Sequence, residues 1–141
     1  MEYFIGFTLA VAVSLFATWV GLDRDRAFYP TVTIVVASYY ALFAVMGGSG
    51  DVLAAEIAAT AGFVLVAVLG FRFNHWLLVA ALAGHGLFDL LHGHVIANPG
   101  VPAWWPMFCM TYDVTAAGYL AWLLFRKAAA ARMARPGPAS E

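Results

Sequence analysis

Long apolar stretches alternate with short polar ones along most of the chain. Five stretches have the length of a membrane crossing, at about 3–22, 31–47, 52–70, 75–96 and 106–125. Each is apolar on all sides, whereas the strands of a membrane barrel alternate apolar and polar residues over about ten positions. The pattern therefore predicts an all-α integral membrane protein, in which residues 1–126 form a five-helix transmembrane bundle.

Residues that end helices separate these stretches. They are Asp23-Arg24-Asp25-Arg26 with Pro30, then Gly47-Gly48-Ser49-Gly50-Asp51, Phe71-Arg72-Phe73-Asn74, and Asn98-Pro99-Gly100-Val101-Pro102. The last of these loops is stiffened by prolines and is equally suited to be a lid over a site or an anchor at the membrane interface. Residues 127–141 are first basic and Ala-rich, then rich in Pro, which predicts an interfacial helix extension that passes into a disordered tail.

The basic residues predict the orientation of the bundle. All seven lie in the first loop, in the third loop or after the last stretch, namely Arg24, Arg26, Arg72, Arg126, Lys127, Arg132 and Arg135. Because short cytoplasmic loops retain Lys and Arg, we expect the N-terminus outside and the C-terminal tail in the cytoplasm. The lipid bilayer is then the main partner of the chain.

Composition excludes several other classes. With 64% apolar residues, 11% charged residues and a net charge of −1, the chain has no basic block that would bind nucleic acid. Its single cysteine, Cys109, cannot form an internal disulfide and reads as a small buried apolar residue. The sequence is compatible with a homo-oligomer but does not fix the number of chains.

Ionisable residues within the predicted helices are the candidates for chemistry, because such groups are costly at bilayer depth. They are Glu56, His85, Asp89, His92 and Asp113. With a rise of about 1.5 Å per residue, all of them fall in the outer half of the membrane. His85, Asp89 and His92 also share a wedge of about 60° on one helix, so one face carries all three.

Three of these residues are acids, and no Lys or Arg lies within the predicted spans to balance them. Imidazole and carboxylate together suit Zn²⁺ or another divalent metal, so we predict a site drawn from His85, Asp89, His92 and Asp113. A position left to water would permit metal-dependent hydrolysis of a lipid-like substrate. Glu56 and Ser38 are the candidate catalytic residues beside it, although Glu56 is shallow enough to reach the interface.

Two other functions use the same residues. The acids can relay protons or cations as part of a coupled transport component, but nothing polar continues along the fourth stretch from His85 toward Arg72. Alternatively, protonated acids can hold helices together in a non-catalytic membrane assembly subunit. The hydroxyls of Ser14, Thr18 and Ser38 are as readily explained by bonds to backbone carbonyls one turn back.

The block from Gly84-His85-Gly86 through Asp89 and His92 to Asn98-Pro99-Gly100-Val101-Pro102, Trp104-Trp105-Pro106 and Cys109 resembles a family of small, functionally uncharacterised bacterial integral membrane proteins. This resemblance implies a bacterial inner-membrane location and no activity. The residue types of the site are also similar to those of alkaline ceramidase and progestin-receptor-type membrane hydrolases. The chain departs from them in having five predicted spans instead of seven and in lacking their terminal His-x-x-x-His pair.

Overall fold

The computed structural model describes residues 1–47 and 50–134, which form five α-helices and one short 3₁₀ turn. These elements are α1 (Glu2–Val20), η1 (Leu22–Arg24), α2 (Phe28–Gly47), α3 (Gly50–Arg72), α4 (Trp76–Val95) and α5 (Trp105–Met133). All five helices are long and apolar enough to cross a membrane. For the described residues, the predicted all-α architecture is therefore confirmed, with five helices that have the length and composition of membrane spans.

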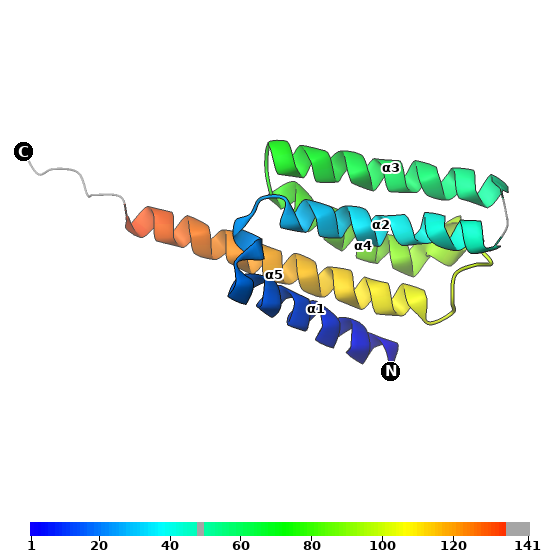
Figure 1. Ribbon diagram of the computed structural model, residues 1–141, viewed down its shortest axis with the longest axis horizontal. Coiled ribbons are helices and arrows are strands. Elements are labelled where there is room, and N and C mark those ends of the chain that lie inside the picture. Colours follow the sequence, from blue (N-terminus) through cyan, green and yellow to red (C-terminus); the bar gives the residue numbers. More distant parts are fainter. Residues whose placement is uncertain (48–49, 135–141) are drawn as a thin grey trace, which may run out of the picture.

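Helix ends differ from the predicted ends where local chemistry decides them. The first helix ends at Val20 because Gly21, with φ of 90°, adopts the left-handed conformation that terminates a helix. The second begins at Phe28, since Pro30 fits a first helical turn. The fifth continues to Met133 and projects beyond the bundle (Figure 1), which agrees with the expected helix extension. The tail residues 135–141, where disorder was expected, lie outside the described residues.

The helices alternate in direction, so the connections gather at two ends (Figure 1). The N-terminus, the end of α2, the start of α3 and the α4–α5 loop share one end, here called the N-terminal end. The turn η1, the α3–α4 turn and the extension of α5 share the other, here called the basic end. At the basic end Arg26 Nη2 donates a hydrogen bond of 3.0 Å to the carbonyl oxygen of Phe71, which ties two loops together.

Small residues allow α5 to pack closely between α1 and α4. The buried residues of α1 are Gly6, Ala10, Ser14 and Ala17, all on the face that meets α5. A side chain at Gly6 would collide with the carbonyl oxygen of Phe108. In α4 only Gly86 has this role, because a Cβ at Gly84 or Gly93 would meet nothing within 4 Å. The expectation that all three glycines of α4 allow close approach is therefore wrong for two of them.

An apolar core closes the half of the bundle nearer the basic end. It is centred on Leu78 and Leu82 of α4 and on Ala116, Ala117 and Leu120 of α5, all at most 5% exposed. The polar residues of α4 and α5 lie nearer the N-terminal end of the same two helices. The fold therefore divides these helices into a polar half and an apolar half.

Candidate metal centre

Acidic residues from separate helices converge in the half of the bundle near the N-terminal end. His85 and Asp89 come from α4, and Asp113 comes from α5. The Nδ1 atom of His85 lies 2.6 Å from Asp113 Oδ2 and 3.5 Å from Asp89 Oδ2. All three side chains are at most 1% exposed. The two aspartates therefore point toward one histidine, as the sequence predicts, and neither faces lipid.

Cys109 belongs to the same group. Its Sγ atom lies 3.8 Å from Asp113 Oδ2. His85, Asp89, Cys109 and Asp113 each offer one ligand atom, and these atoms all lie within 4.8 Å of one another. We call these residues the four-residue cluster. Cys109 is therefore more than the small apolar residue that the sequence predicts, and its position four residues before Asp113 puts both side chains on one helix face.

Three polar atoms of the four-residue cluster are buried and have no hydrogen-bond partner in the described part of the chain. They are His85 Nε2, Asp89 Oδ2 and Asp113 Oδ1. Buried polar groups are rarely left unsatisfied, because the unmade bond costs roughly 1–3 kcal/mol. The cluster can therefore hold a metal ion, whose bonds would satisfy the two carboxylate oxygens. His85 would bind such an ion through Nδ1, the ring atom that faces both aspartates, and its Nε2 atom points away from them.

A second polar pair lies beside the cluster. His92 Nε2 is 2.7 Å from Glu56 Oε1, and the same oxygen accepts a hydrogen bond of 2.8 Å from Asn98 Nδ2. Glu56 is fully buried, so the expectation of a solvated interfacial glutamate is wrong. His92 was predicted as a metal ligand, but the structure pairs it with Glu56 and does not bring it into the cluster.

Tyr40 connects the pair to the cluster. Its hydroxyl donates a hydrogen bond of 2.7 Å to Asp89 Oδ1. Its ring stacks on the imidazole of His92, with centroids 3.8 Å apart and planes 14° apart. Phe63 packs edge-on against His85, and Phe88 packs edge-on against His92. Aromatic rings thus surround both histidines, which keeps their environment low in dielectric constant.

Ser38 does not reach this site. Its side chain is exposed, and its hydroxyl donates a hydrogen bond of 2.7 Å to the carbonyl oxygen of Val35. Tyr40, two residues later in the same helix, points toward the cluster, and residues two apart in a helix face in nearly opposite directions. The prediction of Ser38 as a catalytic residue is therefore corrected, because its hydroxyl is satisfied by its own helix.

The α4–α5 loop covers the N-terminal end of the polar half. Asn98 bonds Glu56 and also donates a hydrogen bond of 3.1 Å to the carbonyl oxygen of Tyr40. Gly100 lies so close to α2 that an added Cβ would collide with the carbonyl oxygen of Phe43. Of the two roles left open for this loop, these contacts favour the lid.

Hydroxyl groups continue toward the basic end between α1, α2 and α5. Thr18 Oγ1 lies 2.7 Å from the hydroxyl of Tyr119 and donates a hydrogen bond of 2.8 Å to Asp23 Oδ2. The hydroxyl of Tyr29 is buried without a hydrogen-bond partner among the described residues and neighbours Ser14. Thr18 therefore does not bond its own backbone as expected. These other helices thus carry hydroxyl groups in the half of the bundle where α4 has none.

Comparison with protein-family models, with curated proteins and with solved structures finds no match to this chain. These comparisons neither support nor oppose the resemblances suggested by the sequence.

Proposed function

We propose that this protein is an integral membrane protein that binds one divalent metal ion at the four-residue cluster. Zn²⁺ is the metal that we expect. The observation that carries the proposal is the set of four buried ligand atoms within 4.8 Å of one another, in a group that has two carboxylates and no described Lys or Arg. A buried charge needs a partner of opposite sign, and a divalent cation would balance both aspartates.

The donor types favour zinc over a hard cation. Imidazole, thiolate and carboxylate are all common zinc ligands, whereas Mg²⁺ and Ca²⁺ prefer oxygen alone. Two ligands about 2.0 Å from a tetrahedral ion lie about 3.3 Å apart. His85 Nδ1 and Asp113 Oδ2 are 2.6 Å apart, so this pair must open, or Asp113 must bind through its unpaired Oδ1 atom.

Metal-dependent hydrolysis of a lipid-like substrate is the catalytic form of this proposal. Four protein ligands make a closed structural site, whereas a catalytic zinc keeps one position for water. Hydrolysis therefore requires that His85, Asp89 and Asp113 hold the ion and that Cys109 stays off it. We place the N-terminal end of the bundle outside a bacterial inner membrane, as the distribution of basic residues favours.

Elemental analysis of detergent-purified protein tests the proposal. We expect about one zinc per chain in the wild type and at least a tenfold lower content in Asp89→Asn and Asp113→Asn, because the amide removes the ligand charge while keeping the side chain's shape. The matched control is Glu56→Gln, which changes a buried acid outside the cluster and should keep its zinc.

Folding must be monitored in the same samples by thermal unfolding. A wild-type protein that takes up no zinc or other divalent metal would overturn the proposal. If, in addition, Asp89→Asn had the zinc content and the thermal unfolding of the wild type, the polar residues would act only in holding the helices together.

Proton- or cation-coupled transport is the second candidate, favoured by the hydroxyl contacts of Thr18 with Tyr119 and Asp23. In this function the acids of the cluster would exchange protons with the basic end through those hydroxyls. Purified protein in liposomes should then carry a pH-dependent ion flux that Thr18→Val reduces severalfold. Zinc binding without any flux would exclude this candidate.

A further inference from the structure

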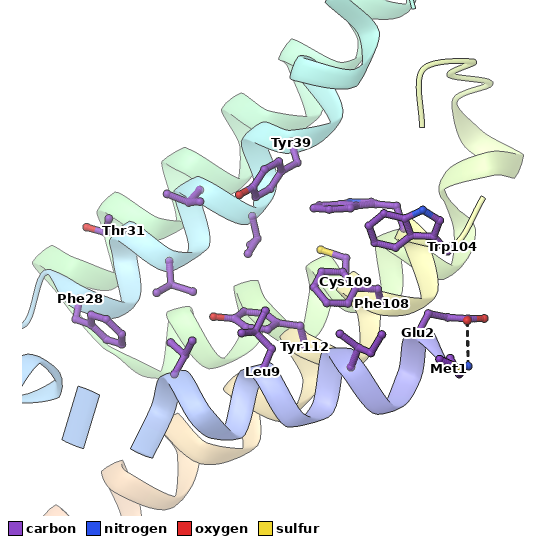
Figure 2. Close-up of a pocket in the computed structure, with 16 residues that line it drawn as sticks. Met1, Glu2, Leu9, Phe28, Thr31, Tyr39, Trp104, Phe108, Cys109 and Tyr112 are labelled. Carbon is purple, nitrogen blue, oxygen red and sulfur yellow. Dashed lines mark hydrogen bonds and ion pairs between the residues drawn. The ribbon is translucent and has the colours of Figure 1, made fainter. Parts of the chain in front are cut away.

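A large groove runs along the bundle between α1 and α2, with α5 as its floor (Figure 2). Its volume is about 810 Å³, which is within the range of sites for small molecules. The groove exists because α1 packs along α5 and α2 packs along α3, which leaves the facing sides of α1 and α2 apart. Representative lining residues are Leu9, Val13, Val32, Val36 and Phe108.

The groove opens sideways, at the depth of the apolar spans. Leu9 is 43% exposed and Val35 is 45% exposed, and both line it. In a bilayer such side chains face hydrocarbon, so whatever enters the groove comes from the lipid phase. A mostly apolar lining at this depth offers a water-soluble ligand few polar partners.

The charged groups of the groove lie at one end. At the N-terminal end stand the terminal ammonium of Met1, paired with Glu2 at 3.1 Å, and the indole of Trp104. Toward the basic end the lining includes Phe28 and Val13, which are apolar, and Thr31, whose hydroxyl already donates a hydrogen bond of 2.8 Å to the carbonyl oxygen of Ala27. Figure 2 shows Tyr39 and Cys109 between these two ends. Such a lining matches an amphipathic ligand whose polar end is at the N-terminal end.

We propose that this groove binds one acyl chain of a membrane lipid, with the carbonyl near Cys109 and the tail directed toward Phe28. Cys109 is four residues into α5, about 6 Å below its first residue, which is near the depth of a lipid ester. Cys109 also belongs to the four-residue cluster, so the bound carbonyl would lie beside the proposed metal. That the lipid is a substrate rests on the proposed function, but its binding does not.

Photolabelling tests the proposal directly. The probe is a phosphatidylcholine with a diazirine in its acyl chain, in phosphatidylcholine vesicles that contain the full chain. We expect labelled peptides to concentrate on the groove faces of α1, α2 and α5. Val32→Trp, which fills the groove, should reduce that labelling at least fivefold.

The matched control is Leu91→Trp, which adds the same side chain at an exposed position of α4. It should leave the labelling of the groove unchanged. Labelling spread evenly over the exposed apolar surface would mean that only annular lipid is present, and would overturn the proposal. A second copy of the chain in the groove, detected by chemical cross-linking between copies, would overturn the proposal as well, because a protein would then be the occupant.

Two further measurements separate this inference from the proposed metal site. Asp89→Asn should lose zinc and keep the groove labelling, whereas Val32→Trp should keep zinc and lose the labelling. Concentrated labelling in a protein without zinc would leave the groove assignment standing and reject the metal site. Zinc binding together with uniform labelling would support the metal site and reject the groove assignment.

Discussion

The two halves of the α4–α5 pair are held together in different ways. Near the N-terminal end, His85, Asp89 and Asp113 meet through short polar contacts that bury charge-bearing atoms. Near the basic end, Leu82 and Leu120 pack in an apolar core without such groups. Because lipid tails are as apolar as leucine, packing in a membrane stabilises through close fit, while buried acids are costly and are usually functional. We therefore expect the apolar half to contribute mainly to stability and the polar half to bind the proposed metal.

The first prediction separates stability from binding. Leu82→Ala removes a fully buried side chain of the apolar core and should lower the free energy of unfolding by about 2 kcal/mol, the low end for such a cavity. The low end applies because apolar transfer contributes little when the unfolded helices are also in lipid. Thermal unfolding would measure the loss, and zinc content should stay at the wild-type level. A loss of zinc in this variant would show that the halves are not independent.

The second prediction concerns the lid over the polar half. Gly100→Ala places a Cβ against the carbonyl oxygen of Phe43, so the loop must shift, at a cost of about 1–3 kcal/mol. Gly93→Ala is the control, because its Cβ would meet nothing within 4 Å and alanine favours the helix. Hydrogen exchange should show faster exchange of the α4–α5 loop in the first variant only. Equal exchange in both variants would mean that the loop does not depend on this contact.

The smallest expected effect on stability concerns His75 at the basic end. Partial burial lowers the pKa of His75 below its usual value of 6.5, and the positive charges of Arg26 and Lys127 lower it further. The folded state then binds fewer protons than the unfolded state, so stability should fall as the pH drops below about 6.5. His75→Gln should flatten this part of the profile of stability against pH. A profile unchanged by His75→Gln would assign the pH dependence to other groups.

Sequence reasoning located the helices and the convergence of Asp89 with Asp113, because hydropathy and helical spacing fix the depth and the face of a residue. It did not predict which histidine meets which acid. The pairing of His92 with Glu56 depends on how α3 packs against α4, and spacing within one helix does not contain that information. Cys109 was not predicted as a ligand, because a lone cysteine usually behaves as a small apolar residue. Its spacing of four residues from Asp113 would have placed it at the site.

X-ray absorption at the zinc edge of the zinc-loaded protein would show which atoms bind the metal. We expect nitrogen and oxygen ligands at about 2.0–2.2 Å together with one sulfur ligand at about 2.3 Å, and loss of that sulfur in Cys109→Ser. A zinc spectrum without sulfur that Cys109→Ser leaves unchanged would contradict the four-ligand site; if Asp113→Asn still removed the metal, only the three-ligand form that hydrolysis requires would remain. Loosely bound zinc with the same spectrum in wild type and Asp113→Asn would mean that the four-residue cluster does not bind the metal.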